Sequence, residues 1–346
     1  MWHVDNKTPF AVDRTWIRDN DGAEVWVVAL KATYECLPNG TTRIAPVQIP
    51  VNTGTVLHED GVSPLHETDL GPAKAATDVW LAGHAWCQSG QPTRQIDVRF
   101  EVGPVKRHVR VHGDRQWVPG MLRNTTGEAT PFKQMPLTWA RAYGGGSPDC
   151  ASGNPVGCGI HRRADGSHPM PNLEHPHHAT GNLLVNHPGH GVGPVPRHWP
   201  GRSRYAGTYD AHWQGTRAPL PPEDLNPAHW QVAPKDMQVP GHLNGGERVF
   251  LDNLTRPGFA ARGLYETRIP KLSLGWRTRF YDGSQALSRS QIHNLILLPD
   301  GVQGSGPLIC VVHHMTLACH AKVNQLDATT VSVKARPLDK AQEHSA

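Results

Sequence analysis

Glycine and proline are concentrated in the middle of this chain. Between Tyr143 and Gly246 they make up 32 of 104 residues, whereas the other 242 residues contain only 34 of them. Proline fixes φ and cannot donate a backbone hydrogen bond, and glycine weakens helices and strands. No long regular element is therefore expected there, and such a composition is typical of linkers and disordered segments.

The same stretch nevertheless contains five large aromatic side chains, namely Trp199, Tyr205, Tyr209, Trp213 and Trp230. A solvated linker has little use for rings that each bury about 150–250 Å². We therefore predict an ordered loop region in which residues 193–213 are fixed by turns and aromatic contacts, with Trp199, Tyr205 and Trp213 mostly buried. Long ordered loops of this kind often form a functional surface.

Residues 94–112 show the clearest strand pattern. Apolar and polar side chains alternate through residues 95–102, Gly103 and Pro104 turn the chain, and the alternation resumes over residues 105–112. Two neighbouring strands that each have one polar face predict an antiparallel pair. We expect the side chains of its inner face to be buried, namely Val98, Phe100, Val109 and Val111.

Further β patterns occupy both ends of the chain. Residues 24–34 are rich in β-branched and aromatic side chains and precede a Pro-Asn-Gly hairpin signal at 38–40. After Glu247 we expect strands at 247–254, 272–280, 292–298, 308–317 and 329–334. Short helices are predicted at 136–143, 222–225 and 227–230, the last capped by Asn226.

These patterns predict a mainly β fold with antiparallel, sandwich-like sheets and a few short helices. Helical crossovers between strands are absent from the pattern, which disfavours a parallel sheet. We divide the chain into a β region at 1–131, an irregular region at 132–246, a β region at 247–335 and a polar tail at 336–346, all in one compact unit. The terminal regions either combine into one sandwich or form separate sheets.

Charge and hydropathy exclude several classes of protein. The 34 basic and 30 acidic side chains give a net charge of +4 and form no long basic stripe, so no nucleic-acid binding is expected. No secretion signal and no apolar run of membrane-spanning length are recognisable. The six cysteines are accordingly expected to remain thiols in a cytoplasmic protein.

A cluster of imidazoles is the strongest candidate for a metal site: Glu174, His175, His177, His178, His187 and His190. Neutral imidazoles bind zinc or nickel, so a metal-dependent hydrolase or a metal-binding protein is the alternative function. The spacing matches no zinc motif, and a polar loop is the plainer interpretation. Cys150, Cys158 and His161 also lack the close Cys–Cys spacing of structural zinc sites, which favours packed thiols. Cys310 and Cys319 read as small buried apolar residues.

Catalytic motifs are not recognisable, so we expect a protein without enzymatic activity and without a cofactor. There is no Gly-x-Ser-x-Gly elbow and no strand–loop–helix context for a phosphate loop. Four carboxylates could form an acid–base pair, namely Asp210, Glu223, Asp224 and Asp236. They neighbour Arg202, Arg204, Arg217 and Lys235, so salt bridges that hold the loops are the expected use, with Arg204 and Asp210 as a buried pair.

Several motifs carry a resemblance to a known family. They include NKTPFAVDRTWIRDNDGAEVWVVALKATYE near the start, PAKAATDVWLAGHAW, FKQMPLTWARAYGG, PVPRHWPGRSRYAGTYDAHW and the following LPPEDLNPAHWQVAPKDMQVPGHLNGGERVFLDNL. Taken together they resemble a bacterial family of domain-of-unknown-function proteins associated with type VI secretion. The resemblance implies an adaptor or chaperone that binds a toxin effector or its PAAR domain and loads it on the VgrG spike. It supplies no catalytic residues.

Arginine and aromatic side chains within these motifs suggest where a partner could bind. Such residues are enriched at interface hot spots. The candidate partner-binding residues are Trp199, Arg202, Arg204, Tyr205, Tyr209 and Trp213. The same rings could instead fix the loops onto the sheets, and the sequence alone leaves both interpretations open.

Overall fold

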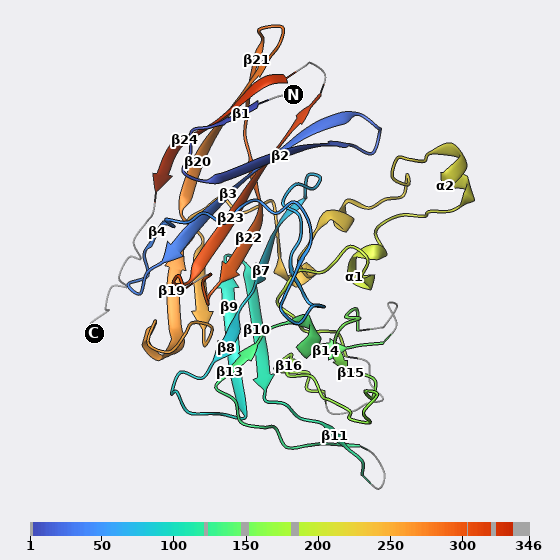
Figure 1. Ribbon diagram of the computed structural model, residues 1–346, viewed down its shortest axis with the longest axis vertical. Helices are drawn as coiled ribbons and strands as arrows, with labels where there is room; N and C mark the ends of the chain where they lie inside the picture. Colours follow the sequence, from blue (N-terminus) through green and yellow to red (C-terminus); the bar gives the residue numbers. More distant parts are fainter. Residues whose placement is uncertain are drawn as a thin grey trace, which may run out of the picture.

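Most of the regular structure is β-strand, as predicted. The computed structural model describes residues 3–120, 124–146, 152–180, 187–302, 304–319 and 323–334. Within these residues the α-helices are short, α1 (Pro200–Ser203) and α2 (Ala211–Thr216), and lie to one side of the sheets (Figure 1). None of the described helices is long and apolar enough to cross a membrane. The predicted tail at 336–346 lies outside the described residues.

The largest sheet combines strands from both ends of the chain. Its order is β17 (Gln238–Pro240), β7 (Ala76–Leu81), β22 (Gln291–Leu298), β23 (Leu308–Ala318), β3 (Glu24–Cys36) and β2 (Ala11–Arg18), and the short β4 (Thr42–Ile44) also pairs with β3. The β7–β22 pair is parallel, and the other pairs are antiparallel. The Pro-Asn-Gly turn predicted at 38–40 lies between β3 and β4 and joins them in a hairpin.

The second sheet contains the strand pair predicted for residues 94–112. Its order is β16 (Leu173–Glu174), β10 (Val105–His112), β9 (Gln95–Val102), β18 (Arg248–Asp252) and β19 (Leu264–Arg268). Val98 pairs with Val109 in an antiparallel register. The four side chains expected on the inner face are all at most 2% exposed, which confirms the alternation argument.

Smaller strand groups complete the β structure. A four-stranded sheet has the order β1 (His3–Asn6), β24 (Val323–Lys334), β20 (Lys271–Phe280) and β21 (Gln285–Ser288). Short pairs join β5 (Val56–Leu57) to β6 (Pro64–His66), β8 (His84–Trp86) to β13 (Gln134–Pro136), β11 (Trp117–Val118) to β12 (Thr125–Thr126), and β14 (Tyr143–Gly144) to β15 (Cys158–Gly159).

One hydrophobic cluster joins the large sheet, the second sheet and the central region. Leu30 and Trp80 enter it from the large sheet, Phe100 from the second sheet, and Trp139 and Trp199 from the irregular region. Side chains from segments far apart in the sequence thus share one core. Of the two arrangements that the sequence left open, the strand order corresponds to the one in which the terminal regions combine.

Only one of the three short helices predicted in the irregular region forms as expected. The 3-10 helix η2 (Pro227–Trp230) begins where expected, and the Asn226 side chain accepts a hydrogen bond from the Ala228 N–H. The helix predicted at 136–143 is wrong except for the 3-10 turn η1 (Trp139–Arg141), because Pro136 ends β13 and pairs with β8. Residues 222–225 form only a turn, closed by Leu225 N–H and the Pro222 carbonyl. Helical turns that were not predicted are α1, α2 and η3 (Lys235–Met237) within this region, and η4 (Ala261–Gly263) after it.

Of the three aromatic side chains in residues 193–213 that were predicted to be mostly buried, only Trp199 is. Trp199 is 2% exposed, whereas Tyr205 and Trp213 are half-buried. Trp213 packs against Tyr209, with ring centres 4.7 Å apart, and donates from Nε1 to the Leu220 carbonyl. It lies in α2, away from the shared core (Figure 1), so the prediction of a mostly buried Trp213 is wrong.

Candidate functional site

A cavity of about 1740 Å³ lies where turns from the whole chain converge. Its walls come from the loop after β4, the β5–β6 hairpin, the start of β8, the segment 114–118, the residues around η1, and the turn between β22 and β23. The strands of the large sheet hold the last of these turns in place, because β22 and β23 pair along most of their length.

Exposed apolar side chains gather around this cavity. The lining residues Val47, Leu57, Val118 and Val302 are 73%, 47%, 46% and 44% exposed. Single exposed apolar residues are ordinary on protein surfaces, whereas several around one hollow form a candidate binding surface. We name these four residues the apolar rim.

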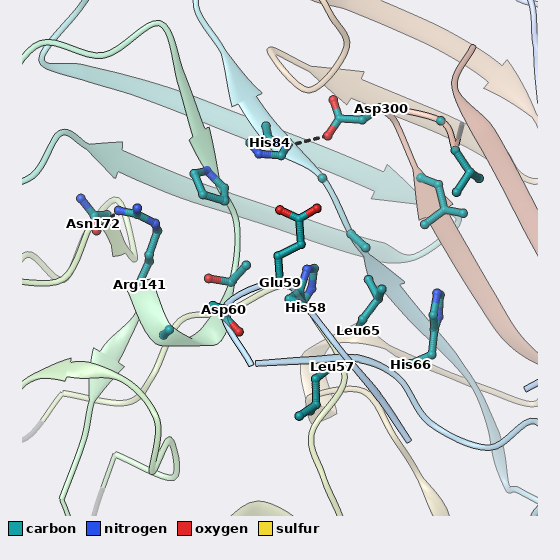
Figure 2. A pocket seen from close by; sticks show the side chains of 18 of the residues that line it. Leu57, His58, Glu59, Asp60, Leu65, His66, His84, Arg141, Asn172 and Asp300 are labelled. Atoms are coloured by element: carbon teal, nitrogen blue, oxygen red, sulfur yellow. Dashed lines mark hydrogen bonds and ion pairs between the residues drawn. The ribbon is translucent and has the colours of Figure 1, made fainter. Parts of the chain in front are cut away.

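A hydrogen-bonded group of polar side chains occupies the wall formed by β8 and the β22–β23 turn. His84 Nδ1 lies 2.8 Å from Asp300 Oδ2, and Trp86 Nε1 donates to Asp300 Oδ1 over 2.7 Å. A Cβ atom on Gly83 would lie 2.8 Å from Pro299 Cγ, so only glycine permits this approach of the turn to β8. The Asp300 carboxylate thus fixes the orientation of the His84 ring (Figure 2).

Glu59 projects from the β5–β6 hairpin toward this group. In Figure 2 its side chain extends in the direction of His84 and Asp300, beside His58. Burial lowers the pKa of His58, while the neighbouring carboxylates of Asp60 and Glu59 act in the opposite direction. His58, Glu59 and Asp60 are consecutive residues of the hairpin and face the same cavity. Glu59 is exposed, and its carboxylate forms no hydrogen bond or ion pair within the described part of the chain.

The opposite wall is held by arginine–carboxylate pairs. Arg141 Nη1 lies 3.0 Å from Asp114 Oδ1 and also donates to Asn172. Arg115 Nη2 lies 2.6 Å from Glu174 Oε1. Arg141 and Arg115 therefore have acidic partners, and this wall is fixed by charge-assisted hydrogen bonds.

Glu174, a predicted metal ligand, is one of these wall-forming groups. Besides Arg115 it accepts hydrogen bonds from His112 Nε2 at 3.1 Å and from the Thr180 N–H at 3.1 Å. Burial by itself would raise the pKa of Glu174, but the His112 hydrogen bond and the charge of Arg115 hold it below its usual value. Its lone pairs are committed to structural contacts.

The predicted histidine ligands are only partly brought together. The His175 ring centre lies 4.8 Å from that of His178, 4.9 Å from that of His190 and 5.7 Å from that of His177, whereas His187 packs edge-on against Tyr143. His190 Nε2 contacts the His108 carbonyl oxygen, and burial lowers its pKa to about 3. Over the residues that the structure describes, no group of three or more His, Cys, Asp or Glu side chains is placed to hold a metal ion.

The cysteines occupy different environments. Cys150 lies outside the described residues, and burial raises the pKa of the half-buried Cys158 to about 11. Cys310 is fully buried, as predicted, whereas Cys319 is half-buried and its backbone N–H bonds to the Glu24 carbonyl.

The predicted partner-binding residues divide into buried and exposed groups. Trp199 packs edge-on against Trp139, with ring centres 5.6 Å apart, and Arg202 is 4% exposed. Tyr205 and Trp213 are half-buried, while Arg204 and Tyr209 are exposed. Arg204 lies over the Tyr205 ring at 4.8 Å. Trp199 and Arg202 therefore hold the loop in place, and the others remain available at the surface.

Of the predicted carboxylates, only Glu223 pairs with one of the neighbouring basic residues, Arg217. Asp210 and Arg204 are both exposed and do not form a buried pair; Asp210 instead caps α2 by accepting from the Trp213 N–H at 2.8 Å. Asp224 accepts from Thr208, and Glu223 lies 3.8 Å from Arg217 while 86% exposed. Asp236 pairs with Arg107 across the chain. Nearness in the sequence shows which charged residues are available, but not the direction in which each side chain points, and therefore not which residues pair.

The sequence analysis did not identify the cavity. Its apolar rim comes from loops and short strands whose valines and leucines look like any others in the sequence. The one local signal is the Asp-Gly pair at 300–301, which predicts the turn but not its contact with His84.

Most of the chain matches one known protein family. A family model described as "Uncharacterized protein conserved in bacteria (DUF2169)" matches residues 21–305. That range includes the whole apolar rim and the Glu59, His84 and Asp300 group. No curated protein and no solved structure matches the chain.

Proposed function

Since this chain belongs to the bacterial DUF2169 family, whose model spans most of its length, we propose that it is a non-catalytic adaptor that binds another protein. Its proposed cargo is a type VI secretion toxin or its PAAR domain, which it stabilises in the cytoplasm and helps to load on the VgrG spike. The choice of these partners rests on the resemblance of the sequence motifs, because the family description names none.

The observation that carries this proposal is the apolar rim around the cavity. Pockets for small molecules have volumes of about 300–1,000 Å³, and the cavity, at about 1740 Å³, is larger. Val47, Leu57 and Val302 are exposed at its edge, where a polypeptide segment could cover them. Such a surface suits a length of protein chain better than a compact metabolite.

Binding of this kind stabilises a cargo by mass action. An adaptor that binds only the folded cargo contributes RT ln(1 + [L]/Kd), about 2.7 kcal/mol when its free concentration is 100 times Kd. The cargo must later be released to the spike. A moderate interface centred on one cavity satisfies both requirements better than a large obligate interface.

The test is co-expression of the protein with the toxin encoded beside its gene. We expect more soluble toxin than without the adaptor, and co-purification of the two proteins. Val47→Asp and Val302→Asp should both reduce co-purification, because each places a charge on the apolar rim. Both side chains are exposed, so neither change should affect folding.

The matched control is Leu287→Asp. Leu287 is 80% exposed on β21 and is not part of the cavity wall, so this variant should bind like the wild type. If the toxin is equally soluble, reaches the spike and kills equally well after deletion of the gene, the adaptor proposal is wrong.

A further inference from the structure

The polar atoms around Glu59 are mostly hydrogen-bond acceptors. Asp300 accepts from Trp86 Nε1, which is always a donor, and its other oxygen faces His84 Nδ1. A carboxylate has no proton to give, so Nδ1 of His84 carries the hydrogen. In the neutral ring Nε2 is then an acceptor. The Glu59 carboxylate adds two further acceptor oxygens (Figure 2).

This part of the cavity also carries uncompensated negative charge. The lining arginines have acidic neighbours: Arg43 lies 2.7 Å from Glu35, and Arg141 lies 3.0 Å from Asp114. Arg163 lies near Cys158, at the opposite wall. Over the described residues, no lysine or arginine forms an ion pair with Glu59, and the ionisable partner of Asp300 is a histidine.

We propose that the cavity binds an extended segment of the cargo in which a lysine or arginine lies between apolar residues. This inference rests on the adaptor function proposed above. The basic side chain donates to Glu59 and His84 Nε2, beside the Asp300 carboxylate. Its apolar neighbours cover Val47, Leu57 and Val302. A cationic group satisfies the acceptors and neutralises the charge, and the apolar residues bury the exposed rim.

The probe is a phage-displayed library of random dodecapeptides, selected on the purified full-length protein. We expect the selected peptides to be enriched in a lysine or arginine with apolar residues on both sides. One selected peptide is then synthesised, and its dissociation constant is measured by fluorescence anisotropy at low and high salt.

Substitution of Glu59 distinguishes a specific charge contact from non-specific apolar binding of the peptide. Glu59→Gln keeps the shape of the side chain and should weaken the peptide about tenfold or more, with a smaller dependence on salt. Glu59→Lys should lose the selected peptides and enrich acidic ones. Glu223→Gln is the control, because Glu223 is 86% exposed and lies away from the cavity wall. Thermal unfolding of every variant should match the wild type, since both positions are exposed.

Several results would overturn the inference while leaving the adaptor proposal intact. In one, the selected peptides show no basic residue, or no peptide is enriched, although the toxin still co-purifies. In another, Glu59→Gln binds the peptide as tightly as the wild type, which would indicate that a different part of the cavity is used. If the toxin itself also fails to co-purify, both proposals fail together. Peptides that bind but resemble a segment of this chain would indicate a second copy as the occupant, and would likewise overturn a cargo segment.

Discussion

Arg202 and Glu67 form a buried ion pair, with Nη1 and Oε2 3.4 Å apart and both side chains 5% exposed. Arg202 also donates to the Val195 carbonyl at 2.6 Å and to the His229 carbonyl at 3.0 Å. Glu67 directly follows β6, the strand that contributes His66 to the cavity wall. One side chain in the irregular region therefore joins its own loop and the turn at His229 to the end of the hairpin that carries Glu59.

Removal of this guanidinium should be strongly destabilising. Arg202→Ala removes the buried partner of Glu67 and leaves it only Arg197, which is 44% exposed and 3.6 Å away, so the change should cost about 3 kcal/mol of unfolding free energy. Arg204→Ala, two residues away and exposed, should change it by no more than about 0.5 kcal/mol. Urea unfolding measures both. Equal midpoints for the two variants would show that the buried pair does not hold the loop.

Two tryptophans of the same loop should differ in their contribution to stability. Trp199 is 2% exposed and packs on Trp139, so Trp199→Ala should cost about 3–5 kcal/mol. Trp213→Ala should cost clearly less, because the ring is half-buried and its main contacts are Tyr209 and the Leu220 carbonyl. Thermal denaturation of both variants checks the order, and a larger loss for Trp213→Ala would contradict it.

Local patterns allowed the strands to be predicted but not their arrangement. The alternation at 95–112 arises because one face of the β9–β10 pair is buried. The start of η2 at Pro227 depends on one side-chain cap, that of Asn226. Both are local effects. The order of the large sheet depends on contacts such as Ile296 with Trp80, which pair across more than 200 residues. No period or turn signal in the sequence records which strands become neighbours.

The candidate site was harder to predict than the strands for a related physical reason. Val47 is 73% exposed and Val51 is 8% exposed, although both follow β4 in similar surroundings in the sequence. Val51 is buried because it packs against Ala29 and Val312 of the large sheet, a contact that the local sequence does not record. The aromatic motif at 199–213 was a candidate partner-binding site because arginine and aromatic residues are common at interfaces. Two of its residues, Trp199 and Arg202, instead fix the loop through buried contacts.

Close packing of the chain at the end of β10 provides another test. A Cβ atom on Gly113 would overlap the Thr130 carbonyl oxygen, and Thr130 is part of the cavity wall. Gly113→Ala should therefore destabilise the fold by about 1–3 kcal/mol through overpacking. Gly54→Ala is the matched control, because no atom lies within 4 Å of a Cβ built there. Differential scanning calorimetry compares the two, and a variant at Gly113 as stable as wild type would refute the close approach.

Buried histidines make the fold sensitive to acid. Burial lowers the pKa values of His313, His314 and His66 to about 4. The charge of Lys74 adds a smaller lowering of the pKa of His314, and the charge of Lys31 does so for His66. His314 also stacks on His293 at 4.0 Å between ring centres, and burial and the charge of His314 hold the pKa of His293 far below its ordinary value.

The expected result is a loss of stability as pH falls from 7.5 to 5. The unfolded chain binds a proton on His66, His313 and His314 near pH 6.5, whereas the folded chain does not until about pH 4. The stabilisation is complete above pH 6.5, declines below it, and levels off once the folded pKa is passed. For His313 alone the loss over this interval is about 2 kcal/mol. His313→Gln, measured by urea unfolding at both pH values, should reduce the pH dependence by about that amount, whereas His212→Gln, at an exposed position in α2, should leave it as in the wild type. An unchanged pH dependence in His313→Gln would mean that this ring is already solvated in the folded protein.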